Sequence, residues 1–155
     1  MYIFDTNSFR ELFRFYPRRF PQLWKRFDEL VSQGEIYSVR EVLKEMQTSG
    51  TDHLDTQWAI QNKELFREPS VAEALFLREI YKIDHFQQGL ERKKLLKGGP
   101  FADPFIIASA KLHNGTVVTE EKEKANGTKI PNICKHFSVQ CTNLEGFMEL
   151  EEWEF

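Results

Sequence analysis

The chain is poor in cysteine, long apolar runs and positive charge. Its two cysteines, Cys134 and Cys141, form no CxxC pair, which favours reduced thiols without a metal or redox role. No apolar run reaches about 18 residues, so the sequence predicts no membrane span. The first residues lack the basic and apolar regions of a signal peptide, and we expect a cytoplasmic protein. The formal net charge of −3 excludes a surface that is basic throughout.

Several common catalytic signatures are also missing. The four histidines show neither an HExxH motif nor Cys/His ligand spacing, which disfavours a zinc enzyme. No glycine-rich phosphate loop is present. The segment Asp5-Thr6-Asn7 follows an apolar strand, but it lacks the second aspartate that we would expect at position 7 of a phosphotransfer nucleophile motif. These three chemistries are therefore disfavoured.

The composition is that of an ordinary globular domain. The 155 residues are 41% hydrophobic and 29% charged, and a chain of this length can bury a substantial core without disulfides. There is no internal repeat and no low-complexity segment. We therefore expect a single domain over residues 1–155.

Two local basic clusters are candidates for contact with RNA. Residues 10–27 interleave arginine and lysine with aromatic side chains, and residues 91–99 read ERKKLLKGG. Basic groups can hold phosphates while aromatic rings stack on unpaired bases. However, Phe9, Phe13 and Phe27 recur at roughly helical spacing, which favours a role in the core over base stacking. A solvated surface is the ordinary interpretation of such charges.

Short apolar strands alternate with helical segments along most of the chain. The expected strands cover residues 2–4, 35–39, 116–119 and 138–142. The expected helices begin after residue 5 and cover residues 22–32, 40–47 and 104–113, the last with Pro104 at its first position. A helical middle from about 52 to 84 carries no strand signal. Such alternation predicts parallel strands joined by right-handed crossovers, in a sheet covered on both faces.

Acidic residues stand at or just beyond the ends of the predicted strands. They are Asp5, Glu41, Glu45, Asp103, Glu120 and Glu121. In parallel sheets, ligands bind outside the carboxyl ends of the strands. Carboxylates gathered there repel one another unless a divalent cation neutralises them, and oxygen ligands with few histidines favour Mg²⁺ or Mn²⁺. The pattern predicts a metal site suited to phosphoryl transfer.

Four segments resemble, in order and spacing, the acidic motifs of PIN-domain nucleases, especially the VapC-like toxin ribonucleases. They are MYIFDTN, YSVREVLKEM, ADPFIIASA and TVVTEEK. The resemblance implies an α/β fold, a three-layer α/β/α sandwich around a short parallel sheet with a helical middle insertion. It also implies metal-dependent cleavage of RNA, with Mg²⁺ or Mn²⁺ held by four catalytic carboxylates: Asp5, Glu45, Asp103 and Glu121.

Supporting residues and partners follow from the same resemblance. Asn7 and Thr119 would orient ligands or water by hydrogen bonds, although both types are also common in turns. Arg10, Arg14 and Lys97 would hold phosphates that flank the scissile bond. The resemblance further implies a cognate antitoxin protein and a homodimer.

Two of the four acidic positions leave alternatives open. Ser38-Val39-Arg40-Glu41 has the form of a capping box, in which Glu41 turns back to the Ser38 backbone, and this favours Glu45 over Glu41 as the ligand. At the fourth position the family pattern has aspartate where this chain has Glu121. Glutamate carries the same charge on a longer arm, and Glu120 is the alternative at this position.

The other two acids have structural interpretations as well. Asp103 precedes Pro104 and could act as a helix N-cap, and Asp5 could form an Asx-turn with Ser8. If all the acids were caps and solvated charges, the chain would be a non-catalytic PIN-like module that binds RNA or protein, or a purely structural interaction domain. The tail, residues 144–155, is interpreted as a terminal helix packed on its own domain, with a docking segment as the alternative.

Overall fold

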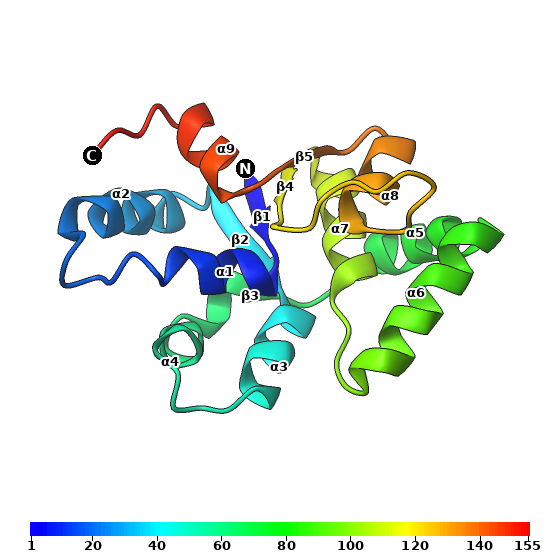
Figure 1. Cartoon of the computed structure of the whole chain (residues 1–155), viewed down its shortest axis with the longest axis horizontal. Coiled ribbons are helices and arrows are strands. Elements are labelled where there is room, and N and C mark those ends of the chain that lie inside the picture. The colour runs from blue at the N-terminus through cyan, green and yellow to red at the C-terminus, as the bar shows by residue number, and fades with distance from the viewer.

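A five-stranded parallel sheet forms the centre of the computed structural model, which describes residues 1–155 (Figure 1). Its strands are β1 (Tyr2–Phe4), β2 (Ile36–Val39), β3 (Phe66–Arg67), β4 (Thr116–Val118) and β5 (Gln140–Thr142). The strand order is β3-β2-β1-β4-β5, and every neighbouring pair is parallel. The predicted α/β class with a short parallel sheet is confirmed.

Helices cover both faces of this sheet, as a three-layer α/β/α sandwich requires. They are α1 (Thr6–Leu12), α2 (Pro21–Ser32), α3 (Arg40–Thr48), α4 (Leu54–Gln61), the 3₁₀ helix η1 (Lys63–Leu65), α5 (Val71–Tyr81), α6 (Asp84–Lys97), α7 (Asp103–His113), α8 (Ile130–His136) and α9 (Leu144–Leu150). No helix combines the length and the apolar composition that a membrane crossing requires.

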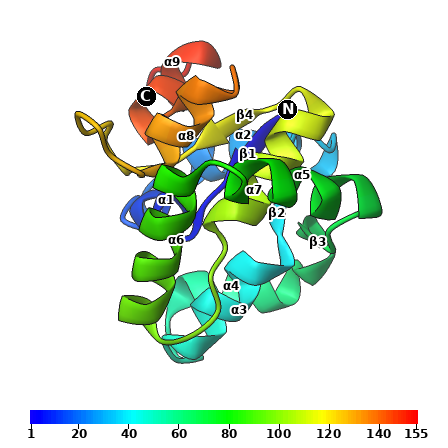
Figure 2. The same cartoon turned by 90° about the vertical axis from the view of Figure 1, so that its right-hand side faces the viewer.

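The two helical layers are built from different parts of the chain. Helix α7 packs directly on β1, β2 and β4, and α5 and α8 pack against α7. Helices α1, α2 and α9 lie on the opposite side of the sheet, as Figure 1 shows. Figure 2 shows the same layers from the side of α5 and α6, where α6 stands in front of the sheet. The helical middle, from α4 to α6, thus reaches both sides of the sandwich.

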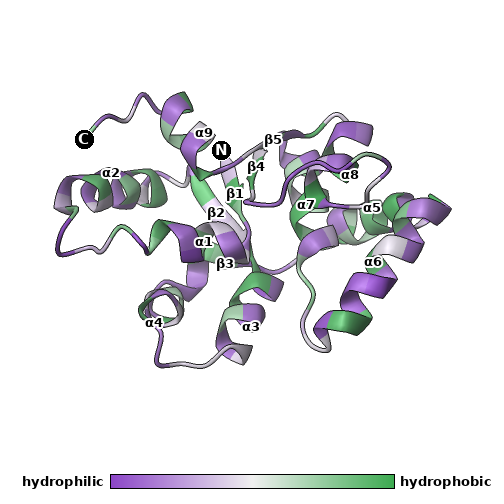
Figure 3. Cartoon of the chain, in the orientation of Figure 1, coloured by the Kyte–Doolittle hydropathy of each residue, from purple (hydrophilic) through white to green (hydrophobic).

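Aromatic side chains fill the layer between the sheet and the N-terminal helices. Phe4, Phe9 and Phe27 are fully buried. The Phe4 ring packs against the rings of Phe9 and Phe27 and against the buried Phe147 ring of α9. Figure 3 shows that hydrophobic residues concentrate along the strands and α7, whereas α6 is mostly hydrophilic. The interpretation of the aromatic residues near the N-terminus as core is confirmed for Phe9, Phe13 and Phe27.

The prediction that the middle of the chain contains no strand was wrong. Strand β3 has only two residues, and it pairs with Ser38 and Val39 at the carboxyl end of β2. A strand this short leaves no alternating pattern in the sequence. Helices α6 and α8 were also not among the expected helices.

The strand order places a topological switch point beside β1. From β1 the chain crosses first to β2 on one side and later to β4 on the other, so the helices that follow these strands diverge. At such a point the crevice outside the carboxyl ends of the strands is open to a ligand. In Figure 1 these ends point downward, toward α3.

Candidate functional site

A pocket of about 120 Å³ lies at the carboxyl ends of the central strands. Four carboxylates that the sequence singled out line it together: Asp5, Glu45, Asp103 and Glu121. Ile106 is its one hydrophobic lining residue. At about 30 Å³ for each water, the pocket has room for only a few water-sized groups. It is therefore small, polar and acidic.

Asp5 follows β1 and is held by two hydrogen bonds. Its Oδ1 accepts a bond of 2.7 Å from the Ser8 amide, which makes Asp5 the N-cap of α1, and its Oδ2 accepts one of 2.5 Å from the Thr119 hydroxyl. Burial raises the pKa of Asp5 to about 6, although the hydrogen bonds from Thr119 and Ser8 oppose that rise. Asp5 therefore both caps α1 and lines the pocket.

Glu45 reaches the pocket from α3 and bridges two other segments. Its Oε1 accepts a hydrogen bond of 3.2 Å from the Thr6 hydroxyl, and its Oε2 accepts one of 3.2 Å from the Ala102 amide. The Lys97 ammonium forms an ion pair with Oε1. Only 5% of Glu45 is exposed, so its carboxylate is fixed between α1 and the start of α7.

Glu41 lies outside the pocket, and the capping box that we predicted for it is wrong. The N-cap of α3 is Val39, and no side chain caps this helix. Ser38 belongs to β2, where its hydroxyl donates a hydrogen bond of 2.5 Å to the Phe4 carbonyl. Glu41 instead pairs with Arg40 at 3.1 Å and with Lys44 at 3.6 Å. Glu45 therefore lines the pocket and Glu41 does not, but a capping box is not the cause: Glu41 is paired with Arg40 and Lys44 instead.

Asp103 and Glu121 face each other across one lysine. The Lys93 ammonium, from α6, forms ion pairs with both carboxylates. The second Glu121 oxygen, Oε2, accepts a hydrogen bond of 2.8 Å from the Ile130 amide at the start of α8. Burial raises the pKa of Asp103 to about 6, with Lys93 lowering it and Glu121 and Glu45 raising it further. The carboxylates are therefore close enough to influence one another.

The helix-capping alternative for Asp103 is wrong. Helix α7 has Ala102 as its N-cap, without a side-chain bond, and Asp103 is already the first helical residue. A carboxylate in this position interacts favourably with the positive end of the helix dipole. Its side chain is nevertheless directed to Lys93 and the pocket.

The remaining predicted residues divide between the pocket and the rest of the fold. Glu120 lies outside it, because its Oε1 accepts a hydrogen bond of 2.8 Å from the Leu144 amide at the start of α9. Thr119 connects two of the acids, since its hydroxyl donates to Asp5 and accepts a bond of 3.1 Å from the Glu121 amide. Asn7 lines the pocket at its exposed rim.

Two of the three basic residues that we predicted to bind RNA lie at the pocket. Arg10 lines it and donates a hydrogen bond of 2.5 Å to the Ser49 hydroxyl. Lys97 lines it as the partner of Glu45. Arg14 points elsewhere: it pairs with Glu11 at 3.3 Å, and 77% of its side chain is exposed.

Lys93 was not among the predicted site residues. It belongs to the basic cluster of residues 91–99, but this segment was not predicted as a helix. Within a helix, Lys93 and Lys97 are four residues apart and share one face. A helix prediction for this segment would therefore have placed Lys93 beside Lys97, facing the same site.

The donor set suits a hard divalent cation, but the present side-chain positions do not form a metal cage. No three Asp, Glu, His or Cys side chains lie close enough together to hold a metal ion. The ammonium groups of Lys93 and Lys97 lie among the carboxylates instead. Four carboxylates without histidine or cysteine are the ligands that Mg²⁺ and Mn²⁺ prefer. Burial raises the pKa of Asp5 and of Asp103, and a bound cation would stabilise the charged form of both carboxylates.

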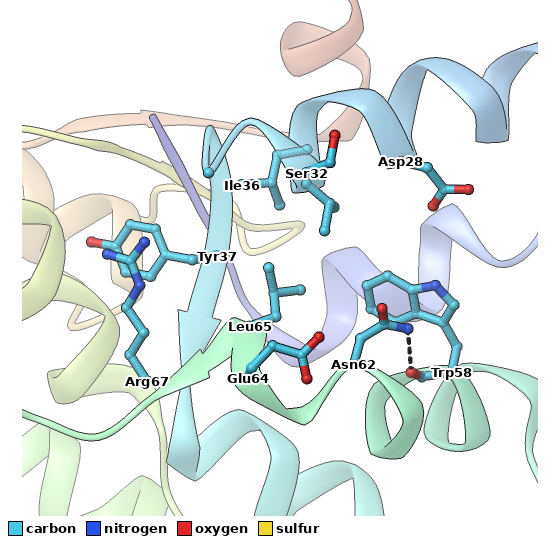
Figure 4. Close-up of a pocket in the computed structure, with 11 residues that line it drawn as sticks. Asp28, Ser32, Ile36, Tyr37, Trp58, Asn62, Glu64, Leu65 and Arg67 are labelled. Atoms are coloured by element: carbon cyan, nitrogen blue, oxygen red, sulfur yellow. Dashed lines mark hydrogen bonds between the residues drawn. The ribbon is translucent and has the colours of Figure 1, made fainter.

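A larger cavity, of about 550 Å³, lies between α2, β2 and α4 (Figure 4). Its wall includes Ile36, Leu65 and the Trp58 ring. The Arg67 guanidinium lies 3.8 Å over the centre of the Tyr37 ring at one end of this cavity. None of the acidic residues predicted as ligands lines it. The candidate site is therefore identified by its four carboxylates and not by its volume.

Comparison with known families gives one match. The model of a family described as Domain of unknown function (DUF4411) matches residues 2–155. No curated protein matches the chain.

Proposed function

The chain belongs to the DUF4411 family, and we propose that it is an endoribonuclease that hydrolyses RNA phosphodiester bonds with Mg²⁺ or Mn²⁺. One observation carries this proposal: four carboxylates from distant parts of the sequence line a single pocket. Burying carboxylates destabilises a fold unless they are paired or bind a cation. Titratable groups concentrated in this way, with a raised pKa at Asp5 and Asp103, are typical of functional sites.

The place of the pocket supports the same proposal. It lies outside the carboxyl ends of β1 and β4, at the switch point of a parallel sheet, where ligands bind in open α/β folds. The three-layer architecture also agrees with the resemblance to PIN-domain nucleases that the four acidic segments carry. The helical region between β2 and β4 corresponds to the middle insertion that we expected.

The four carboxylates would hold the cation between them. When bound, a divalent cation supplies positive charge to the scissile phosphate and lowers the pKa of an attacking water. The Thr119 hydroxyl donates to the Asp5 carboxylate and accepts from the Glu121 amide, so it fixes the orientation of Asp5 and of the backbone at Glu121. Thr6 and the Ala102 amide do the same for Glu45. The hydrogen bonds thus hold the carboxylates of Asp5 and Glu45 in one orientation before substrate binds, which reduces the reorganisation that these two ligands require.

RNA is the substrate class that the rim of the pocket supports. Arg10 and Lys97 place positive charge beside the acids, where they would hold the phosphates that flank the scissile bond. By the same resemblance we extend the proposal to the toxin of a toxin–antitoxin pair, with a cognate antitoxin and a homodimer as partners.

One specific observation favours a second candidate function, a non-catalytic PIN-like module that binds RNA or protein. Lys93 and Lys97 already neutralise Asp103, Glu121 and Glu45 in part. Ion pairs of this kind occur in purely structural networks as well. A module of this type would bind RNA without a metal requirement.

Cleavage of labelled tRNAs and single-stranded RNAs with added Mn²⁺ or Mg²⁺ separates the two functions. We expect the wild-type protein to cut in the presence of the cation and Asp103→Asn to lose cutting, with little change in melting temperature. Glu120→Gln is the matched control: it removes a charge outside the pocket, while the glutamine oxygen can still accept the bond from the Leu144 amide, and we expect it to retain activity. RNA binding by a folded wild-type protein that neither cuts nor responds to the cation would favour the non-catalytic module instead.

A further inference from the structure

Two lysines on one helix supply positive charge to the acidic pocket. Lys93 forms ion pairs with Asp103 and Glu121, and Lys97 forms one with Glu45. Of the four carboxylates in the pocket, only Asp5 has no lysine partner, and it is held by hydroxyl and amide groups instead. The lysines therefore contact every pocket carboxylate except Asp5.

The position of these lysines is built into the fold. Leu90 and Phe86, one and two turns before Lys93 on α6, are buried in the core. Residues 86, 90, 93 and 97 are spaced by three or four, so the buried anchors and the lysines lie along one face of the helix. Gly89 brings α6 against Thr128 so closely that a Cβ at position 89 would overlap the Thr128 side chain. The core thus fixes the helix that carries the lysines.

The net charge of the pocket matches one divalent cation. The four carboxylates carry four negative charges, and Lys93 and Lys97 return two positive ones, which leaves a net charge of about −2. Arg10 also lines the pocket, but Asp55, 3.9 Å away and outside the pocket, offsets its charge. One divalent cation neutralises what remains. A second would leave the site positive while the lysines stay in place.

The lysines are also suited to contact the substrate. About a third of each side chain is exposed, 31% for Lys93 and 39% for Lys97, so both side chains reach the surface at the pocket. An ammonium group is a flexible point charge with three donors and can turn from a carboxylate to a phosphate without losing its charge. The two groups lie on the same wall of the pocket, beside the carboxylates that would hold the cation.

We propose that Lys93 and Lys97 are resident cations of the site: they restrict it to one divalent cation and bind the phosphate of the RNA substrate. This inference rests on the proposed function, because it assigns roles within the same pocket. It makes the two lysines part of the site that handles substrate, instead of structural ion pairs that merely join α6 to α3 and α7.

The test measures Mn²⁺ binding by titration calorimetry, without RNA, for the wild type, Lys93→Met and Lys97→Met. We expect the wild type to bind one Mn²⁺ per chain. Each methionine variant should bind Mn²⁺ at least about fivefold more tightly, because a competing positive charge has been removed from beside the ligands. Lys94→Met is the matched control: Lys94 is an exposed neighbour on the same helix and does not line the pocket, so its loss should change the affinity less than about twofold.

A second measurement uses a short labelled single-stranded RNA with a phosphorothioate backbone, which resists hydrolysis. In the presence of Mn²⁺, Lys93→Met and Lys97→Met should bind it at least about fivefold more weakly than the wild type and Lys94→Met do. A purely structural role would not produce tighter metal binding together with weaker RNA binding. The two variants are independent, so a folding defect in one leaves the other as the test.

The outcomes separate this inference from the proposed function. If the wild type binds Mn²⁺ and both methionine variants bind it equally well or more weakly, the lysine inference fails and the metal-dependent function stands. The inference also fails if RNA affinity is unchanged in both variants. If the wild type shows no binding but a methionine variant does, the lysines are confirmed as competitors of the cation. If no protein binds Mn²⁺, both proposals fail.

Discussion

Thr119 donates a hydrogen bond of 2.5 Å to Asp5 although the two residues are 114 positions apart in the sequence. Strand register explains the contact. Phe4 of β1 is the register partner of Val118 of β4, so the residues that follow these strands emerge side by side. Ser8 strengthens the connection, because its hydroxyl donates a bond of 2.8 Å to the Val118 carbonyl. The sheet itself therefore positions the first carboxylate of the pocket.

Asp5→Asn is expected to stabilise the metal-free protein at neutral and alkaline pH. The folded-state pKa of Asp5, about 6, lies above its ordinary value of 3.8, so the folded state binds more protons than the unfolded state between these values. Stability consequently falls as the pH rises through this window. At pH 8 the buried charge costs about 1 to 3 kcal/mol, which corresponds to several degrees in melting temperature. Asparagine remains a good N-cap for α1.

Thermal melts at about pH 5 and pH 8 in a chelating buffer measure this effect. The variant should melt several degrees above the wild type at pH 8, and its advantage should be about half as large at pH 5, which lies between the two pKa values. Added Mn²⁺ should reverse the order at pH 8, because a cation that binds only the folded wild type raises its melting temperature. A variant less stable than the wild type at both pH values would show that the Asp5 charge does not destabilise the folded state.

Glu45→Gln and Glu41→Gln form a matched pair on one helix. Both substitutions remove one negative charge from α3, but only Glu45 lines the pocket. We expect Glu45→Gln to weaken Mn²⁺ binding by about tenfold or more and Glu41→Gln to change it less than about twofold. Calorimetric titration of both variants provides the measurement. Equal losses would mean that the helix contributes only general negative charge.

The strands and their acidic ends could be predicted because the sequence signals are local. The buried apolar residues of β1, β2 and β4 each lead into residues that begin a helix or a turn, and this boundary is visible without any tertiary information. Once the strands are parallel, acids that follow β1, β2 and β4 gather at one edge of the sheet. Asp103 follows no strand, but it opens the helix that leads back to β4 and therefore starts at the same edge. Asp5, Glu45, Asp103 and Glu121 do share one pocket in the structure.

The features that could not be predicted depend on contacts between residues that are distant in the sequence. Glu120 and Glu121 are adjacent, and what separates them is the Leu144 amide on one side and the Ile130 amide on the other. No local pattern reports either contact. Strand β3 and the role of Lys93 escaped prediction for similar reasons, since β3 has two residues and α6 contains Gly89 and only a weak apolar stripe.

Gly89→Ala is expected to destabilise the protein although alanine favours a helix. Alanine in place of glycine in a helix gains about 1 kcal/mol. Here the new methyl group would overlap the Thr128 side chain, and overpacking of this kind costs about 1 to 3 kcal/mol. Denaturant unfolding should therefore show a net loss of stability. Thr128→Gly in the same chain removes the overlapping atoms and should restore it; a stabilised single variant would mean that α6 does not pack closely against this loop.

Phe147→Ala and Phe155→Ala distinguish a structural tail from a docking segment. Phe147 of α9 is fully buried, and its ring meets those of Tyr2, Phe4 and Trp153 at centroid distances of 4.8 to 5.2 Å. Its truncation should lower the free energy of unfolding by about 3 to 5 kcal/mol, because a cavity opens beside β1. Phe155 is 60% exposed, and its truncation should change stability by no more than about 0.5 kcal/mol.

The same pair of variants also bears on the pocket. Helix α9 begins at the Leu144 amide that holds Glu120, directly before Glu121, so a loosened α9 would release the loop that carries this carboxylate. Phe147→Ala should therefore weaken Mn²⁺ binding as well as stability, whereas Phe155→Ala should affect neither. Calorimetric titration at a temperature where both variants remain folded measures the effect. A destabilised Phe147→Ala protein with wild-type Mn²⁺ affinity would show that the Glu121 loop holds its position without α9.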